Sequence, residues 1–240
     1  MGLCGNGALV LNFDVEPAAV VEHDHWHTKE HMPERLSIPG FLRGTRWIAE
    51  GGSPRYLVIY EVRDVNVLTG ADYLQRLNNP SAWTSQTMAQ VRGMRRGFCR
   101  VEGSVGLGLG HALLQIHYSP VEGRRQELHD WLLGDALPGI ASAPDYASAH
   151  ILESAITPPM TDEQRLRGKD ASVDTVLIVT GCDAGFIDRV AGVDLAATRF
   201  DAHGCAPSSV RSRFRYDYSL TAAECMAVAQ ASGSQRSARS

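Results

Sequence analysis

Cysteine, long apolar runs and an excess of either charge are what this 240-residue chain has little of. Its 5 cysteines are an odd number, stand far apart and form no C-x-x-C pair, which favours reduced thiols over a disulfide framework or a zinc site. No apolar run approaches the roughly 20 residues that a membrane-spanning helix needs. The start also lacks a basic segment followed by an apolar one, so we predict a cytoplasmic protein with no membrane partner.

The charges nearly balance. Lys and Arg number 23 against 27 Asp and Glu, which gives a formal net charge of -4. This balance offers no general attraction to a polyanion, so we predict no nucleic-acid partner. Hydrophobic residues make up 44% of the chain, enough to bury a substantial core.

The chain contains an internal repeat at a fixed offset of 105 residues. The run ALVLNF at residues 8–13 lies over LLQIHY at residues 113–118. The same gapless shift pairs a tryptophan, an acid and two prolines in the same order: Trp26 with Trp131, Glu30 with Asp135, Pro33 with Pro138 and Pro39 with Pro144. This agreement indicates two copies of one supersecondary unit.

Hydrophobic period and turn residues give each copy the order β-α-β-β-α-β. In the first copy we expect strands at 9–15, 42–50, 56–62 and 95–101, with helices at 18–36 and 71–91 and a break at Pro80. In the second copy we expect strands at 112–118, 146–152, 175–180 and 210–218, with helices at 122–137 and 184–197. This order is that of the ferredoxin-like fold, in the α+β class.

Each such unit leaves one face of its sheet bare. We therefore predict two tandem ferredoxin-like repeats whose antiparallel sheets pack face to face as an intramolecular, barrel-like pseudodimer with the helices outside. The predicted divisions are 1–106, then 107–221 with a solvated insertion near 156–172, then a flexible tail at 222–240. The glycine-rich stretch 103–110 is interpreted as the linker between the copies, and further homo-oligomerisation stays open.

Four of the 9 histidines lie between His23 and His31. At helical spacing His23, His27 and His31 share one face. Three interpretations compete. His27 and His31 could grip a metal ion, but a third ligand is not evident, so no metal is predicted. One imidazole could move a proton, oriented by Glu30 or Asp24. The histidines could also form a polar helix face in water.

The residues that follow this cluster carry a family resemblance. WHTKEHMPERLSIPGF at 26–41, RW at 46–47, YLVIYE at 56–61 and LNNPSAWT at 77–84 resemble the EthD-like branch of the dimeric α+β barrel superfamily, over most of residues 8–101. The resemblance implies that fold, here as a tandem duplication in one chain. It also implies relatives that include cofactor-free monooxygenases, muconolactone-type isomerases, polyketide cyclases, haem enzymes and proteins without known activity.

The resemblance also suggests site residues. His31 is the first candidate for a catalytic base or acid, His27 is the second, and Glu30 is expected to orient the imidazole. The second copy has Ala136 and Leu132 in place of the two histidines, so histidine chemistry is expected in the first copy only.

Three further residues are expected to line a substrate pocket between helix and sheet, namely Arg46, Trp47 and Tyr60, with Arg46 attracting a carboxylate or enolate. Nothing beyond the fold suggests an axial-ligand pocket for haem, so no cofactor is predicted.

These observations predict a cofactor-independent enzyme of the isomerase, cyclase or monooxygenase type, using His31 for proton transfer on a small aromatic or lactone-like metabolite. The alternative is a non-catalytic small-molecule-binding or assembly protein. A partly buried His31 near an acid, facing a cavity of a few hundred cubic ångström, would favour the enzyme. A solvated His31 over a closed core would favour the alternative.

Overall fold

The computed structural model describes residues 2–228. The first half of the chain follows the predicted element order. Its elements are β1 (Gly7–Val15), η1 (Pro17–Ala19), α1 (Val20–Trp26), η2 (His27–His31), α2 (Met32–Leu36), β2 (Phe41–Ala49), β3 (Tyr56–Val62), η3 (Val65–Thr69), α3 (Ala71–Leu77), α4 (Ala82–Met88) and β4 (Val91–Gly106). The predicted break falls between α3 and α4, because Pro80 lacks the backbone N–H that a continuous helix needs.

The second half repeats this order with an insertion. Its elements are β5 (Ala112–Tyr118), α5 (Arg125–Trp131), η4 (Leu132–Ala136), α6 (Leu137–Ala141), β6 (Tyr146–Ile156), α7 (Asp162–Arg167), β7 (Ala171–Ser172), β8 (Thr175–Gly181), α8 (Ala184–Arg189), η5 (Val190–Asp194), α9 (Ala197–Ala202) and β9 (Val210–Thr221). The bounds of α5, η4 and α6 are those of α1, η2 and α2 shifted by 105 residues. Both η2 and η4 are π-helical turns. Because such turns are rare, their presence at equivalent positions indicates that the fold determines them.

Eight antiparallel strands close into a barrel. Their order is β1-β3-β2-β9-β5-β8-β6-β4, and β4 pairs back onto β1. Two long strands join the halves: β4 pairs with both β1 and β6, and β9 pairs with both β2 and β5. The two sheets are thus the two sides of one closed barrel, which gives their edge strands hydrogen-bond partners.

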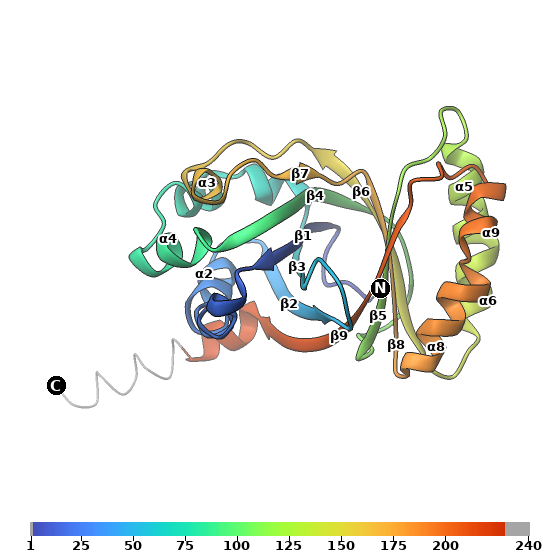
Figure 1. Cartoon of the computed structure of the whole chain (residues 1–240), viewed down its shortest axis with the longest axis horizontal. Helices are drawn as coiled ribbons and strands as arrows, with labels where there is room; N and C mark the ends of the chain where they lie inside the picture. Colours follow the sequence, from blue (N-terminus) through green and yellow to red (C-terminus); the bar gives the residue numbers. More distant parts are fainter. Residues whose placement is uncertain (1, 229–240) are drawn as a thin grey trace.

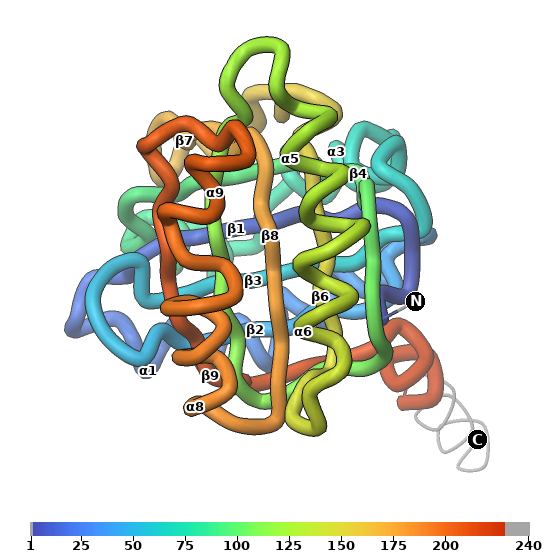
Figure 2. Tube along the Cα trace, turned by 90° about the vertical axis from the view of Figure 1, so that its right-hand side faces the viewer, coloured from blue at the N-terminus to red at the C-terminus, as the bar shows by residue number. Residues whose placement is uncertain are grey.

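Helices cover the barrel on two sides. Figure 1 shows α2, α3 and α4 on one side and α5, α6, α8 and α9 on the other. Figure 2 looks onto the second group, with the first-half strands crossing behind it. One apolar core lies on the helix-facing side of each half, and a third fills the barrel between the sheets. The central strands β3 and β8 are buried along their whole length, as their continuous apolar runs require.

The insertion near 156–172 is not the solvated loop that its polar composition predicted. It carries α7 and β7, and the side chains of Thr161, Glu163 and Gln164 are buried. In Figure 1 it runs, in gold and orange, from the second half back over the first, beside α3. The polar composition was misleading because Glu163 and Gln164 pair with buried arginines of the first half, Arg35 and Arg96 respectively.

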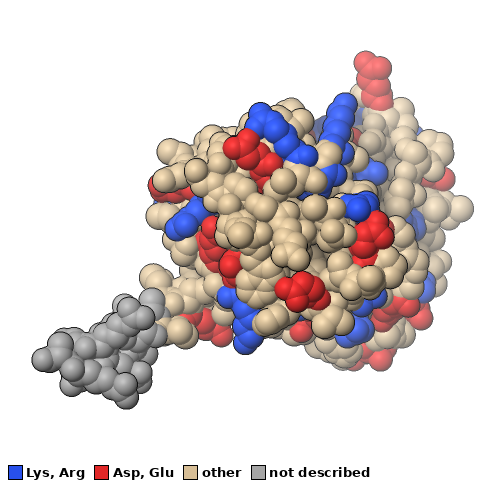
Figure 3. All heavy atoms as spheres, turned by 60° about the vertical axis from the view of Figure 1, so that its left-hand side comes forward, with Lys and Arg blue, Asp and Glu red and all other residues tan. Residues whose placement is uncertain are grey.

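Other boundaries differ in detail. Residues 103–106 of the expected linker belong to β4. Within the expected tail, residues 222–228 are helical, and 229–240 lie outside the described residues. Across the part of the chain that the structure describes, no helix is long and apolar enough to cross a membrane. Acidic and basic residues are interspersed on the face in Figure 3, in keeping with the balanced composition.

Candidate functional site

The predicted face of histidines exists, but it is turned inward. His23, His27 and His31 lie four residues apart along α1 and η2, and Arg35 continues the same line in α2. All four side chains are buried against the sheet, with exposed fractions of 0 to 4%. We call these four residues the polar stripe. Its burial excludes the interpretation of a histidine face in water.

The same line in the second half is apolar. At the offset of 105 residues, the polar stripe corresponds to four buried residues of the second helical core, Leu128, Leu132, Ala136 and Ile140. The corresponding helical segment of the second half therefore forms without these buried polar groups. Burying imidazole and guanidinium groups costs free energy, so the fold itself does not account for the polar stripe.

His27 is held at both ring nitrogens. Its Nδ1 lies 3.3 Å from Nη1 of Arg46, and its Nε2 lies 3.2 Å from the hydroxyl of Tyr60. A guanidinium can only donate, so Nδ1 accepts and Nε2 carries the hydrogen that Tyr60 accepts. The Tyr60 hydroxyl keeps its own hydrogen to donate. Burial, then the nearby His23 and Arg46, lower the pKa of His27 well below its usual value, in agreement with a neutral ring.

Arg46 holds His27 in place from strand β2, where β2 pairs with β9. Its Nε donates to Asp217 of β9 at 2.6 Å, and its Nη1 donates to the backbone oxygen of Asp24 at 3.3 Å. Asp24 also accepts from the hydroxyl of Tyr56 at 2.8 Å and lies 3.1 Å from His23. Arg46 therefore binds Asp217, the backbone of Asp24 and His27. These contacts position the His27 ring and do not direct the guanidinium to a ligand.

His31 lies at the wall of a small buried cavity. Its ring packs on Trp26 at a centroid distance of 4.3 Å, and its Nδ1 has no hydrogen-bond partner among residues 2–228. Burial, then the charge of Arg35, lower the pKa of His31 well below its usual value, so the ring is neutral. The cavity measures about 20 Å³, which is room for one water molecule.

The cavity has polar and apolar walls. His31, Tyr60 and Arg35 face it from the first half, and Glu163 and Arg167 face it from the insertion. Arg96 of the first half also lines the cavity, and leucine, methionine and tyrosine side chains complete the lining: Leu9, Leu11, Tyr73, Met88 and Met94. An apolar wall with a few convergent polar groups is the usual composition of a small-molecule site.

Arg35 is the charged centre of this cavity. Its Nη2 donates to the carboxylate of Glu163, and both side chains are at least 94% buried. Burial alone would lower the pKa of Arg35, but the carboxylate beside it raises the pKa above its usual value. Arg35 therefore stays charged inside the cavity.

Two predicted site residues lie elsewhere. Glu30 does not orient His31, since its carboxylate accepts from the hydroxyls of Ser81 and Thr84 at 2.5 Å and 3.2 Å. Trp47 is buried in the core between the two sheets and not between helix and sheet. Neighbouring residues of a strand point to opposite faces, so Trp47 and Arg46 cannot line the same pocket.

The sequence interpretation missed Arg35 and the acids of the insertion. A signal for Arg35 was present, because it continues the i, i+4 spacing of the histidines by one step. Glu163 stands 128 residues from Arg35 in the chain, and no local pattern joins them.

Metal binding by the histidines has no support in this geometry. Both nitrogens of His27 are engaged, and the described residues contain no group of three or more His, Cys, Asp or Glu side chains that could hold a metal ion.

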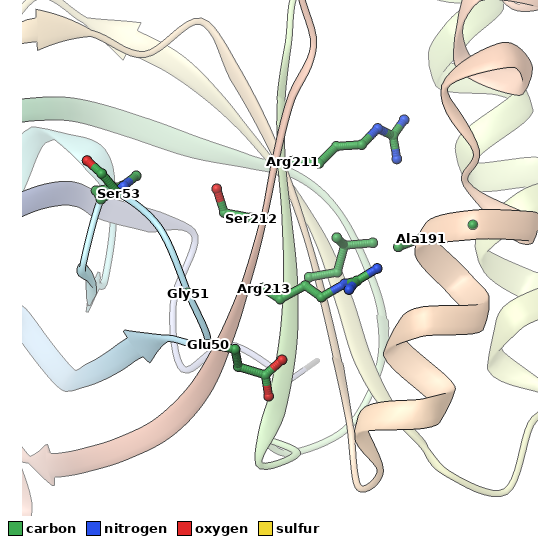
Figure 4. A pocket seen from close by; sticks show the side chains of 10 residues that line it. Glu50, Gly51, Ser53, Ala191, Arg211, Ser212 and Arg213 are labelled. Atoms are coloured by element: carbon green, nitrogen blue, oxygen red, sulfur yellow. The ribbon is translucent and has the colours of Figure 1, made fainter.

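A larger hollow, of about 600 Å³, lies on the surface between residues 50–54, β9 and η5 (Figure 4). Its two arginines extend toward the neighbouring helices, where Arg211 donates to the backbone of Leu195 and Arg213 pairs with Asp188 at 3.1 Å. Nε and Nη2 of Arg211 have no hydrogen-bond partner among residues 2–228. The lining of this hollow contains no histidine, so the cavity beside the polar stripe is the better candidate site.

Comparison with known proteins places the fold. A scan against protein-family models finds no match, and a search of curated proteins finds none at a significant level. Among solved structures, an anthrone oxidase-like protein matches with a TM-score of 0.62 and 12% identity, covering 90% of this chain and 92% of that one. A candidate monooxygenase from Fusobacterium nucleatum matches with a TM-score of 0.58 and 8% identity, over 91% of this chain and 96% of that one.

A candidate monooxygenase from Lactobacillus acidophilus NCFM matches with a TM-score of 0.57 and 9% identity, over 90% of this chain and 97% of that one. At these identities the matches show the fold alone. The chain spans nearly the whole length of each of these three neighbours, so the similarity extends over the whole barrel.

Proposed function

We propose that the chain is a tandem duplication of one ferredoxin-like unit, near the EthD-like branch, in which the first copy holds a cofactor-independent enzyme site and the second completes the barrel. In this proposal His31 transfers a proton on a small aromatic or lactone-like metabolite. The neighbouring structures, which include an anthrone oxidase-like protein and candidate monooxygenases, support chemistry of this kind on the fold.

One observation carries the proposal. The polar stripe, Arg46 and Tyr60 occupy positions that the second half fills with apolar side chains. The second half folds with apolar side chains at these positions, so burying polar groups at them in the first half is not needed for folding and costs free energy. Costly buried polar groups at one of two equivalent places are best explained by chemistry performed there.

The proposed step is proton abstraction from a carbon beside a carbonyl group. The C–H bond breaks, its electron pair stays on the substrate as an enolate, and the proton passes to a neutral imidazole nitrogen of His31. The hydroxyl of Tyr60, with its hydrogen free to donate, stabilises the enolate oxygen. An enolate can be reprotonated, close a ring or react with oxygen, so this step serves an isomerase, a cyclase or an oxygenase alike.

Hydrogen–deuterium exchange tests the step directly. Aromatic ketones and lactones incubated with the protein in D₂O are expected to lose their α-proton NMR signals, and His31→Leu should slow this loss by about 100-fold or more. His150→Gln is the matched control, because His150 is buried between the sheets and bonds to Ser104. Equal exchange by the His31→Leu variant and the unmodified protein would refute the role of His31.

The non-catalytic alternative draws on the size of the cavity. Room for one water cannot hold an aromatic ring, so the site in this state is closed. Compounds that raise the melting temperature without losing α-protons in D₂O would favour a binding or assembly protein.

A further inference from the structure

The insertion of the second half forms one wall of the site in the first half. Helix α7 packs beside α3, α4 and β4. Asn78 accepts a hydrogen bond from the backbone of Asp162, and Gln164 accepts one from Arg96 at 2.8 Å. In Figure 1 the segment reaches this place by crossing the barrel from β6 and returning along β7. The first half has only the short connection 50–55 at the equivalent place.

Two acids of the insertion pair with the arginines of the cavity wall. Asp170 lies 3.0 Å from Arg96 and 3.0 Å from Arg167, and its pair with Arg96 joins the insertion to the first half. Glu163 meets Nη2 of Arg35 and lies 3.6 Å from Arg167. Glu34 is a second and more exposed neighbour of Arg35, 3.4 Å from Nη1.

Glu163 thus places a carboxylate inside the cavity that holds His31 and Tyr60. No room remains there for a ligand while that side chain is present. A buried guanidinium needs a counter-charge, so Glu163 could leave Arg35 only if another anion replaced it. A carboxylate suits Arg35 best, because the planar fork of the guanidinium matches its two oxygens.

We propose that the site takes an organic carboxylate, that Arg35 binds the carboxylate group, and that Glu163 of α7 fills its place in the closed chain. A carboxylate on Arg35 would lay the rest of the molecule against His31 and the apolar wall. This inference rests on the proposed function and narrows it to an acidic substrate. Binding requires α7 to withdraw Glu163, so the helix acts as a gate that the substrate opens by competition.

Benzoate and its neutral analogue benzamide test the proposal by calorimetry. Glu163→Gln keeps the shape of the side chain and removes the competing charge. We expect this variant to bind benzoate about tenfold more tightly than the unmodified protein, since more of the chain is competent to bind, with no such gain for benzamide. Asp162→Asn is the matched control, because Asp162 is on the same helix but exposed, and its benzoate affinity should not change.

A rescue experiment gives independent evidence. Glu163→Ala removes the carboxylate altogether, and propionate should raise the melting temperature of this variant more than propionamide does. Equal benzoate affinity in Glu163→Gln and the unmodified protein, or equal effects of propionate and propionamide, would overturn the proposal. Benzoate titrations of the unmodified protein and of His31→Leu, run beside the D₂O assay, separate the two proposals. Selective carboxylate binding by both proteins, with no α-proton exchange by the unmodified protein, would leave this inference standing and refute the proposed function.

Discussion

The polar stripe makes one physical prediction independent of any substrate. Replacing His31 with Leu puts an apolar side chain of similar size against Trp26 and removes the unpartnered Nδ1. Leaving a buried polar nitrogen unpaired costs about 1–3 kcal/mol. We therefore expect His31→Leu to raise the free energy of unfolding at neutral pH by about 1 kcal/mol, after some loss of fit.

The pH dependence sharpens this expectation. The pKa of buried His31 is lowered well below the unfolded value of about 6.5, so the unfolded chain binds a proton that the folded chain does not. The stability that comes from keeping His31 neutral is present above the unfolded pKa and is lost as the pH falls below it. Between about pH 7.5 and 5.5 this single group should cost the unmodified protein about 1.4 kcal/mol more than the variant.

Urea denaturation at about pH 7.5, 6.5 and 5.5 measures both effects. His25→Gln serves as the control, because His25 is exposed on the same helix and its loss removes an imidazole without touching the cavity. The reasoning fails if His31→Leu is less stable than the unmodified protein at all three pH values, or if the two lose stability in parallel as the pH falls.

Two further predictions concern the same comparison between the halves. Leu132→His places the imidazole of the first half in the second, where no equivalents of Arg46 and Tyr60 exist, and should lower the free energy of unfolding by about 3 kcal/mol in urea denaturation. A loss below about 1 kcal/mol would contradict the argument that burying an imidazole on this line is costly. Tyr60→Phe removes the hydroxyl that donates to the enolate and leaves Nε2 of His27 unpaired. The rate of α-proton exchange in the D₂O assay should fall by about 100-fold, and the free energy of unfolding should fall by about 1–2 kcal/mol. An unchanged exchange rate would show that Tyr60 has no part in the mechanism.

Much of the fold was predictable because its information is local and repeated. Alternation and turn residues locate the eight barrel strands, the offset of 105 residues relates β1 and β2 to β5 and β6, and the break at Pro80 follows from the chemistry of proline. Closure into one barrel was less accessible. Closure depends on two pairings between the halves, β4 with β6 and β9 with β2. Hydrogen bonds between strands that are distant in the chain leave no periodic pattern in the sequence.

The site was predictable where one element carries it. The helical spacing of His27 and His31 gave their shared face, but whether that face meets water or the sheet depends on packing. The alternation of side chains along a strand is enough to place Trp47 and Arg46 on opposite faces, and the predicted pocket neglected that rule. Glu30 was assigned to the wrong partner because proximity along a helix does not decide which hydroxyls of a facing helix its carboxylate reaches.

Comparing the two halves shows which buried side chains the fold requires and which it does not. The first helical segment of each half has the same bounds at the offset of 105 residues, and in the second half its buried line is apolar. The architecture therefore does not require polar side chains on this line. The excess in the first half is a neutral imidazole without a partner at Nδ1, an oriented tyrosine hydroxyl and an arginine whose counter-charge comes from a distant insertion. Stability alone would favour apolar side chains at all of these places together, as in the second half. The presence of all three groups around one cavity is therefore best explained by a ligand that Glu163 replaces in this state.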